Sequence, residues 1–405
     1  MLHFGASPRY DMHRGSSRVR ESPPVSTSSP TIMTVPPTGG AAVPRLDGLQ
    51  LGRAIAACAV VISHASGHYS GGTHGAWNLL STYGVTLFFV ISGYIMVLTT
   101  GRGTFSPTAF LSRRIRRIVP IYYIANLVLA AATLAAPGAF KRTVFDGWHM
   151  LKSLLFIPAY DPAGSGYIWP FFRLGWTLNY EMFFYLVFAS LFALGVAQRA
   201  FCVTIILGGL ILLGIVHPFT AAIPAFYTQV ATIGFIFGTL LGMIAVYRPI
   251  RLGTAWMWIA LLVSFVLLGV MASMFEAIRH DRTTQLWLSI ACTLHIALLV
   301  SVIDGRGVSV PRPLLYIGDA SYSIYLFHMF AVGAVTAIAH RLPAALLYPA
   351  MVASACSGIV AGIIVYRYVE APLNRFFRYR RPLSAADISG SAAATEQSGA
   401  ATTGR

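Results

Sequence analysis

The sequence predicts an all-α, polytopic integral membrane protein with about ten transmembrane helices in one bundle. Two observations support this expectation. The chain has 405 residues, of which 56% are hydrophobic and only 10% are charged. That is too little polar surface to cover a soluble core of this size. Its middle also holds long apolar runs of the length that a helix needs to cross a bilayer.

The predicted spanning segments are apolar runs separated by short polar connections. They lie near 48–66, 78–99, 116–136, 174–196, 200–217, 225–246, 252–275, 284–303, 314–339 and 345–367. The stretch 146–158, DGWHMLKSLLFIP, is amphipathic and too short to span, so we expect an interfacial or re-entrant segment there. No convincing internal repeat is present, which counts against a secondary transporter built from inverted repeats.

The two ends of the chain differ from the middle in composition. Residues 1–45 are rich in Ser, Pro, Thr, Gly and Arg, and the last residues are rich in Ala, Ser, Thr and Gly. They predict disordered tails over 1–45 and 376–405, around a membrane domain over 46–375. No apolar run follows the early arginines, so a cleaved signal peptide is not expected. The cysteines lie in apolar runs and predict small buried residues rather than disulfides or metal ligands. They are Cys58, Cys202, Cys292 and Cys356.

The chain is strongly basic, with a net charge of +16 from 29 Lys and Arg against 13 Asp and Glu. In a soluble protein this balance would suggest nucleic acid, but in a membrane protein it indicates cationic cytoplasmic loops. With the N-terminal tail inside, 21 basic residues fall on the cytoplasmic side, seven fall outside, and Arg53 lies within a helix. We therefore expect both termini in the cytoplasm, a multi-pass protein of the bacterial inner membrane, and no nucleic-acid partner.

The first apolar run, RAIAACAVVISH, begins with Arg53 and ends with His64. Eleven residues bring the two side chains to nearly the same helix face, about 16 Å apart along the axis. An arginine at the centre of a membrane helix costs roughly 2.5–3.5 kcal/mol even on the most permissive scale. Arg53 snorkelling to the interface, with His64 as a helix contact, is the structural alternative. The shared face favours a functional groove.

Four arginines gather in SRRIRRIVPIYY, residues 112–123, at the expected cytoplasmic beginning of a helix. A guanidinium group binds phosphate through two parallel hydrogen bonds, and coenzyme A carries a pyrophosphate and a 3′-phosphate. A donor-binding clamp and a positive-inside anchor both fit this pattern. The residues are Arg113, Arg114, Arg116 and Arg117.

Two further segments place polar groups inside apolar helices. GWTLNYEMFFY, residues 175–185, sets Glu181 about two turns into a helix that enters from outside, at a predicted depth like that of His64. A hydrogen-bond hub of Glu181 with Asn179 and Tyr180 is the structural alternative. YIGDASYSIYLFHMF, residues 316–330, carries side chains that suit either helix packing or catalysis. Those singled out are Asp319, Ser321, Tyr322, Ser323, Tyr325 and His328. His295, alone in TLHIALL, is more typical of a satisfied core histidine.

Taken together, these motifs resemble membrane-bound acyltransferase family 3, and especially its bacterial exopolysaccharide O-acetyltransferases. The resemblance covers about residues 45–375. Besides the motifs above, it rests on GVTLFFVISGYIM at 84–96 and YRYVEAPLNR at 366–375. It implies functional roles for Arg53 and His64, and acyl-CoA binding by Arg113, Arg114, Arg116 and Arg117. The acceptor does not follow from the resemblance, because the family modifies many hydroxyl compounds.

The expected activity is transfer of an acyl group, taken to be acetyl, from cytosolic acyl-CoA to a hydroxyl of a polysaccharide or lipid-linked sugar. His64 has the pKa of a general base at neutral pH. Glu181 would orient the imidazole if the two meet, and Arg53 would hold a donor phosphate or stabilise oxyanion charge. Supporting roles are open to Asn179, Asp319, Ser321, Tyr325 and His328. No metal is expected.

Several alternatives stay open at this stage. The pantetheine arm of the donor either threads towards His64, or His64 is transiently acylated. The rival functions are a transporter or flippase for a lipid-linked or anionic substrate, and a carrier that only moves acetyl groups outward. The expected partners are a sugar acceptor, the lipid bilayer and the polysaccharide biosynthesis machinery.

Overall fold

The computed structural model describes residues 46–67, 69, 75–101, 105–139, 143–278, 282–339, 343 and 346–379. The chain divides into two units, Met1–Thr34 and Val35–Arg405, and the first lies outside the described residues. The predicted tail over 1–45 therefore lies outside them, as does 380–405. Residues 376–379 fall within the predicted C-terminal tail, yet they are helical and end the last helix.

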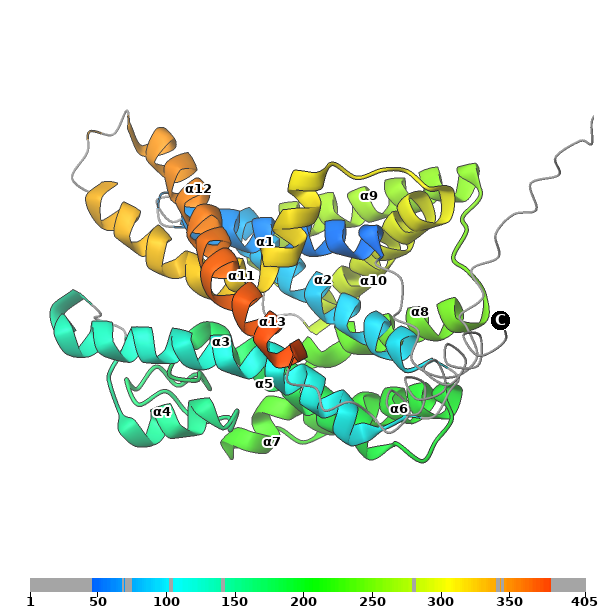
Figure 1. Ribbon diagram of the computed structural model, residues 1–405, viewed down its shortest axis with the longest axis horizontal. Helices are drawn as coiled ribbons and strands as arrows, with labels where there is room; N and C mark the ends of the chain where they lie inside the picture. Colours follow the sequence, from blue (N-terminus) through cyan, green and yellow to red (C-terminus); the bar gives the residue numbers. More distant parts are fainter. Residues whose placement is uncertain are drawn as a thin grey trace, which may run out of the picture. The chain divides into compact units, whose positions relative to one another are not determined.

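Helices make up the regular structure of the described residues, apart from one isolated antiparallel bridge between Tyr160 and Ile168 (Figure 1). The α-helices are α1 (Asp47–Gly67), α2 (Gly75–Thr100), α3 (Pro107–Ala135), α4 (Gly147–Leu154), α5 (Trp176–Ser190), α6 (Val196–Val216), α7 (Ala222–Tyr227), α8 (Ile233–Tyr247), α9 (Thr254–Ile278), α10 (Arg282–Leu299), α11 (Arg312–Ala339), α12 (Leu347–Val365) and α13 (Ala371–Tyr379). Short 3-10 turns are η1 (Pro137–Ala139), η2 (Arg173–Gly175) and η3 (Val230–Thr232), and π-helical turns are η4 (Val300–Asp304) and η6 (Tyr366–Glu370).

Nine helices in the described part of the chain are long and apolar enough to cross a membrane. The all-α, polytopic membrane fold is thus confirmed. The difference from ten lies in the predicted segment 174–196, where α5 has only 15 residues. At 1.5 Å per residue α5 is about 22 Å long, shorter than the roughly 30 Å hydrocarbon core of a bilayer.

Helix α5 is short because the segment before it packs against the middle of its neighbours. The Ser153 hydroxyl, at the end of α4, lies 2.8 Å from the hydroxyl of Tyr122, halfway along α3. A Cβ at Gly175 would overlap the ring of the same Tyr122. The Tyr325 hydroxyl of α11 donates to the Leu174 carbonyl at 3.1 Å. Residues 143–175 therefore fill the space that an outer half of α5 would occupy. Helix α4 itself is too short to span, as expected for 146–158.

Helix α3 begins nine residues before the predicted 116. The Ser106 side chain caps its N-terminus by accepting from the Ala109 N–H at 3.4 Å, and Pro107 occupies the first turn, where its missing N–H costs nothing. The arginine cluster consequently lies in the body of α3 rather than at its beginning. Pro120, four residues beyond Arg116, interrupts the helical hydrogen bonds just after the cluster.

Three helices begin at the same end of the bundle, which we call the arginine end. Arg53 near the start of α1 hydrogen-bonds Ser321 near the start of α11. The Tyr322 hydroxyl of α11 donates to the Ile118 carbonyl in the first half of α3, at 2.7 Å. Glu370, just after α12, returns to this end and accepts from Ser323. The described chain thus starts and finishes at the arginine end. Besides the nine long helices, the short helix α5 and the segment before it together cross the bundle once. We call the opposite end the loop end.

Close contact between helices is set by small residues. Helix α11 packs along α1 and α12, and α2 packs along α1 and α8 (Figure 1). A Cβ on Gly362 of α12 would overlap the backbone of Ile324 on α11, and a Cβ on Gly238 of α8 would overlap the backbone of Val90 on α2. Glycine at these positions lets the helix backbones approach, as in other membrane helix pairs.

Substituting Gly362 with Ala is therefore expected to destabilise the protein by about 1–3 kcal/mol through overpacking. The measurement is the midpoint of thermal unfolding in detergent. The matched control is Gly333→Ala on α11, where an added Cβ meets nothing within 4 Å. An unchanged midpoint for Gly362→Ala would contradict the close approach of α11 and α12.

Candidate active site

A cavity of about 90 Å³ lies between α1, α2, α3, α5 and α11, on the side of the arginine end. Four charged side chains face it, three of them cationic, together with hydroxyl groups and aromatic rings. The lining residues that carry polar groups are Arg53, Ser92, Arg114, Arg117, Thr177, Glu181, Tyr185, Ser321, Tyr322 and Tyr325. We call this space the arginine cavity.

Arg53 is fixed within the arginine cavity by α11. Its Nε and Nη2 atoms both donate to the Ser321 hydroxyl oxygen, at 3.1 and 2.9 Å. Two residues further along α11, the Ser323 hydroxyl donates to the Glu370 carboxylate at 2.6 Å. Glu370 is only 3% exposed, and its charge attracts both Arg53 and Arg117. Arg53 therefore does not snorkel away but is held inside the bundle.

Glu181 reaches the arginine cavity from α5. Its carboxylate accepts from the Ser92 hydroxyl of α2 at 2.8 Å and from the Tyr185 hydroxyl one turn further along α5. Tyr180 points elsewhere, because its hydroxyl donates to the Phe226 carbonyl at 2.9 Å. These contacts join Glu181 to α2 rather than to the hub that the sequence left as an alternative.

The arginine cluster of α3 divides between two faces of the helix. Arg114 and Arg117 are half-buried and line the arginine cavity, whereas Arg113 and Arg116 are exposed and outside its lining. The Arg114 guanidinium lies over the rings of Phe110 and Tyr185, at 5.6 and 5.7 Å from their centroids. Stacking of this kind holds a guanidinium group in place without neutralising it.

The charge of the arginine cavity favours an anion. Three guanidinium groups face a single carboxylate on its walls, so the formal balance of the lining is positive. Its volume of about 90 Å³ suits a small anionic group such as a single phosphate, or the thioester end of a long donor. Arg113 and Arg116 remain at the surface for the larger part of such a donor.

His64 lies along α1 from the arginine cavity, towards the loop end. Its ring lies against that of His328 from α11, with centroids 5.3 Å apart and ring planes tilted by 32°. His328 is fully buried and its Nδ1 lies 3.0 Å from the Ile324 carbonyl, which makes Nδ1 the protonated nitrogen. Its Nε2 is buried with no hydrogen-bond partner among the described residues. His64 itself is half-buried, so it is the more accessible member of the pair.

Tyr325 connects the two levels. Its side chain lines the arginine cavity, and its ring centroid is 6.3 Å from that of His328. Its hydroxyl also lies 2.9 Å from the Thr177 hydroxyl of α5, which fixes the ring between α5 and α11. Tyr325 therefore lies between the arginine cavity and the histidine pair.

The predicted equal depth of Glu181 and His64 is wrong. Glu181 lines the arginine cavity beside Arg53, and His64 is not among the residues that line it. Eleven residues of α1 separate Arg53 from His64, a distance of about 16 Å along the helix axis. The error follows from α5: the sequence predicted a full crossing that begins at 174 near the outer surface, but α5 begins at mid-depth. Glu181 therefore lies nearer the arginine end.

The other predicted supporting residues have different surroundings. Ser321 binds Arg53 directly, as described above. Asp319 is half-buried outside the cavity lining, and its charge attracts Arg53. Asn179 is fully buried and its amide group has no hydrogen-bond partner in the described part of the chain. His295 lies apart, on α10, with its Nδ1 3.0 Å from the Tyr83 hydroxyl, as a core histidine would.

Glu370 is the residue that sequence reasoning missed. It lies at the end of the π-helical turn η6, and such turns are often found at functional sites. The motif YRYVEAPLNR, which contains Glu370, indicates a family resemblance but assigns no role to this carboxylate. A carboxylate five residues beyond the end of α12 gives no signal by itself, because its partners are Ser323 on α11 and charges on α1 and α3.

Comparison with known proteins identifies the family of the chain. The family described as acyltransferase domain (acyltransferase family 3) matches residues 46–368. The chain is 38% identical to the exopolysaccharide production protein ExoZ of Rhizobium meliloti (strain 1021), over 74% of this chain and 91% of the relative. It is 24% identical to the acyltransferase MdmB of Streptomyces mycarofaciens (76% and 84%) and 27% identical to nodulation protein 10 of Rhizobium leguminosarum bv. viciae (71% and 83%). No solved structure matches the chain.

The matched region contains Arg53, His64, the arginines of α3, Glu181 and His328. It ends two residues before Glu370. From this match and from the relatives, the chain belongs to acyltransferase family 3 and is a multi-pass membrane acyltransferase.

Proposed function

We propose that the protein transfers an acetyl group from cytosolic acetyl-CoA to a sugar hydroxyl of an exopolysaccharide or its lipid-linked precursor. The observation that carries the proposal is the pair of sites along α1: an anion-binding cavity at Arg53 and a histidine pair at His64 and His328. The name of the relative from Rhizobium meliloti supports exopolysaccharide as the acceptor class. The protein would lie in the bacterial inner membrane, with the arginine end in the cytoplasm, and would work beside the polysaccharide biosynthesis machinery.

The donor would bind from the arginine end. Arg113 and Arg116 at the surface suit the phosphates of the nucleotide, while Arg114, Arg117 and Arg53 face the narrow cavity through which the pantetheine arm would pass. Glu181 and Glu370 act as positioning residues, because their charges attract the guanidinium groups, while hydrogen bonds from Ser92 and Ser323 hold the two carboxylates in place. No metal takes part in this scheme.

The chemical step would take place at the histidine pair. His64 removes the proton from the acceptor hydroxyl, whose oxygen attacks the thioester carbonyl. The tetrahedral intermediate collapses to the ester, and the thiolate of coenzyme A leaves and takes the proton from the imidazolium of His64. His328 packs against His64 and sets the orientation of its ring. In this scheme the pantetheine arm passes Tyr325, and His64 remains unacylated throughout.

The test is acetyl transfer by purified protein. Protein reconstituted in nanodiscs with acetyl-CoA labelled in the acetyl group is expected to form labelled, alkali-labile saccharide ester and to release free coenzyme A. A transporter or an acetyl carrier would form no saccharide ester. Label retained on the protein after denaturation, at His64, would favour the acylated-histidine route over the threading route.

The two faces of α3 should give different kinetic effects. Arg113→Ala or Arg116→Ala is expected to raise the KM for acetyl-CoA several-fold with kcat little changed, because surface contacts to the nucleotide bind ground state and transition state alike. Arg114→Ala or Arg117→Ala should lower kcat as well, since these side chains shape the cavity. Steady-state kinetics on correctly inserted variants provide the measurement. Identical effects on both faces would contradict the division.

Both ends of the described chain lie at the arginine end, so both termini are expected in the cytoplasm. Protease added to inside-out vesicles should remove tags at either terminus, while in right-side-out vesicles both tags should be protected. Cleavage of one tag in each kind of vesicle would contradict an even number of passes.

A further inference from the structure

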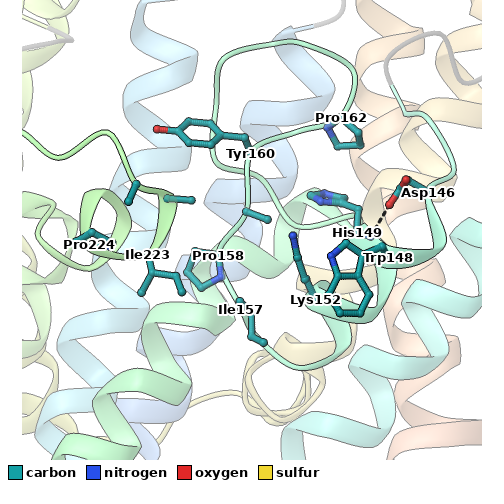
Figure 2. A pocket seen from close by; sticks show the side chains of 13 residues that line it. Asp146, Trp148, His149, Lys152, Ile157, Pro158, Tyr160, Pro162, Ile223 and Pro224 are labelled. Carbon is teal, nitrogen blue, oxygen red and sulfur yellow. Dashed lines mark hydrogen bonds between the residues drawn. The ribbon is translucent and has the colours of Figure 1, made fainter.

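A second and larger pocket, of about 550 Å³, lies in the segments that fill the loop end, and it shares no lining residue with the arginine cavity (Figure 2). Three pieces of chain form its walls: α4 with its capping residue Asp146, the loop over 157–162, and the start of α7 at 221–224. We call it the loop-end pocket. Pockets of 300–1,000 Å³ are typical of small-molecule sites.

The direction of the helices places this pocket. Helix α3 runs from the arginine end to the loop end, where it ends at Ala135, and α4 follows it. Helix α6 runs in the same direction, and α7 follows it. Helix α1 runs the same way and carries His64 near its end. The loop-end pocket therefore opens on the side of the bundle opposite to the exposed arginines of α3.

The walls combine exposed aromatic rings with fixed polar groups. Trp148 is 65% exposed and Tyr160 is 47% exposed, and the Lys152 Nζ lies 5.5 Å from the centroid of the Trp148 ring. The Tyr160 hydroxyl donates to the Thr220 carbonyl at 2.7 Å, which fixes the ring at the rim. Figure 2 shows Trp148, His149 and Lys152 projecting from one helix towards the centre. Such walls suit a ligand with apolar faces and a ring of hydroxyl groups.

His149 supplies a neutral hydrogen-bonding group within the walls. It is only 7% exposed, and burial lowers the pKa of its imidazole below the ordinary value, although the carboxylates of Asp161 and Asp146 act in the opposite direction. At neutral pH the ring is therefore uncharged. The backbone N–H of His149 donates to the Asp146 side chain at 2.5 Å, so the first turn of α4 is held in place.

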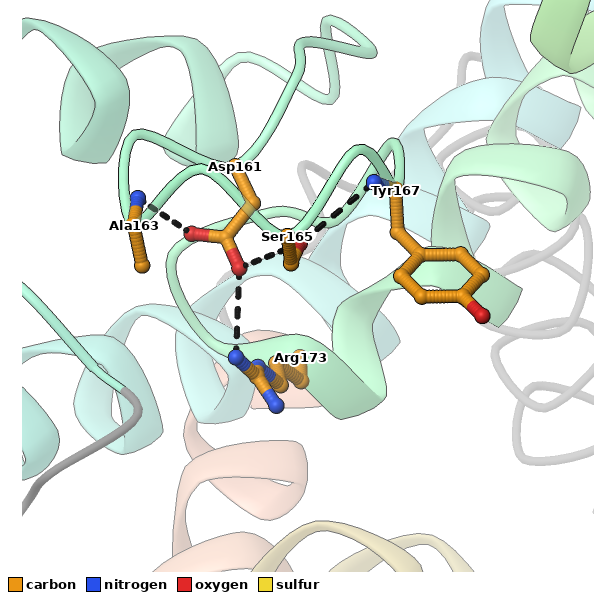
Figure 3. A network of polar contacts seen from close by, with 5 residues as sticks. All are labelled: Asp161, Ala163, Ser165, Tyr167 and Arg173. Carbon is orange, nitrogen blue, oxygen red and sulfur yellow. Dashed lines mark hydrogen bonds and ion pairs between the residues drawn. The ribbon is translucent and has the colours of Figure 1, made fainter.

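The loop that forms one wall is fixed by its own hydrogen bonds (Figure 3). The Asp161 carboxylate accepts from the Ala163 N–H at 3.1 Å, from the Ser165 hydroxyl at 2.9 Å and from Arg173 at 3.1 Å. Arg173 comes from η2, directly before α5, so the network ties the loop to the bundle. A wall held in this way needs little ordering when a ligand binds, which improves affinity.

We infer that the loop-end pocket binds a sugar unit of the acceptor saccharide other than the one that is acylated. This inference rests on the proposed function, because a polymeric acceptor extends beyond the reacting hydroxyl. Trp148 and Tyr160 offer faces for stacking on the apolar side of a sugar ring, and Lys152 and His149 offer hydrogen bonds to its hydroxyl groups. The pocket thus selects the acceptor, while the histidine pair carries out the reaction.

The alternative occupant is the membrane itself, since tryptophan and tyrosine also gather at lipid interfaces. Two features favour the saccharide. The rings of Trp148 and Tyr160 line a pocket and do not form a belt around the bundle. The same pocket holds the buried imidazole of His149 and the ammonium group of Lys152, which lie one helical turn apart on α4. Tyr167, which is 61% exposed in the same loop but outside the pocket lining, gives a matched control for a purely interfacial role.

The experiment measures saccharide binding directly. Wild-type protein in nanodiscs is titrated, without acetyl-CoA, with de-O-acylated oligosaccharide repeat units from the exopolysaccharide of the strain that carries the gene. Calorimetry gives the Kd. Trp148→Ala and Lys152→Ala are each expected to weaken binding about tenfold or more, while Tyr167→Ala and the donor-side variant Arg113→Ala leave it unchanged. Trp148 and Lys152 are not core residues, and unchanged thermal midpoints verify that their variants are folded.

Each contrary result overturns the inference. Wild-type protein that does not bind the repeat units, or Trp148→Ala protein that binds as tightly as wild type, means that the pocket is not a saccharide site. A change in affinity for vesicles of anionic phospholipid, with saccharide affinity unchanged, makes it a lipid contact. Failure of the proposed function has a different signature: saccharide binds through Trp148, but no ester forms when acetyl-CoA is added.

Discussion

Replacing His64 with Ala is expected to lower kcat for acetyl transfer by about 10²–10⁴-fold, the usual loss when a general base is removed. The KM for acetyl-CoA should change little, because the arginine cavity lies about 16 Å away along α1. His64→Gln keeps a hydrogen-bonding group but cannot accept a proton, so its activity should be as low as that of His64→Ala. The measurement is ester formation under saturating acetyl-CoA, with thermal unfolding to verify the fold.

The control for His64 is another histidine of the bundle. His295 on α10 is held by the Tyr83 hydroxyl and lies outside the lining of the arginine cavity. His295→Ala should therefore retain most of the activity. Equal losses for the two variants would reduce His64 to a packing residue, and wild-type activity in folded His64→Ala protein would remove it from the mechanism.

Replacing Arg53 with Ala is the second change with a large expected effect. The substitution removes one of three cationic groups from the arginine cavity and leaves the Ser321 hydroxyl without its donor. Removing one partner from a buried, hydrogen-bonded charged group costs about 2–5 kcal/mol, so kcat/KM should fall about 30-fold or more. Arg53→Lys restores the charge but not the two-point contact with Ser321, so it should recover only part of kcat/KM.

An exposed arginine at the same end provides the comparison for Arg53. Arg248 follows α8 at the surface and outside the cavity lining, so Arg248→Ala should keep kcat/KM near the wild-type value. Full recovery of activity in Arg53→Lys would show that charge alone matters, and equal effects at Arg53 and Arg248 would refute a specific role for the cavity.

Much of the fold was predictable because the length and composition of each apolar run are local properties of the chain. The prediction of small buried cysteines holds only for Cys292, because Cys58 and Cys202 are half-buried and Cys356 is exposed. Among the helices the exception is α5, which is short because residues 143–175 pack against Tyr122 and Tyr325. Those contacts join segments far apart in sequence, so hydropathy alone could not reveal them.

The site was predictable in its residue types but not in its grouping. The 100° helical period orders the α3 arginines as Arg116, Arg113, Arg117 and Arg114 around about 160° of the helix surface, with no gap that separates two pairs. Which of them face inward depends on α5 and α11, which the sequence does not place. For the same reason the sequence paired Glu181 with His64, whereas the structure sets Glu181 beside Arg53, and the contact of His64 with His328 was not foreseen.

The altered grouping changes the expected behaviour of a double variant. Residues that act as one unit give non-additive losses, whereas distant residues give losses that multiply. Glu181→Gln and His64→Ala now fall in the second class, because one supports the donor cavity and the other the chemical step. Glu181→Gln combined with Arg53→Ala should instead be hardly worse than Arg53→Ala alone.

The central claim is that donor and acceptor reach the protein from opposite ends of the bundle. The most direct measurement uses proteoliposomes of known orientation, with labelled acetyl-CoA supplied on one side and oligosaccharide acceptor on the other. Saccharide ester should form only when acetyl-CoA is on the side of Arg113 and Arg116 and the acceptor is on the side of α4. Ester formed only when both substrates share one side would contradict the account.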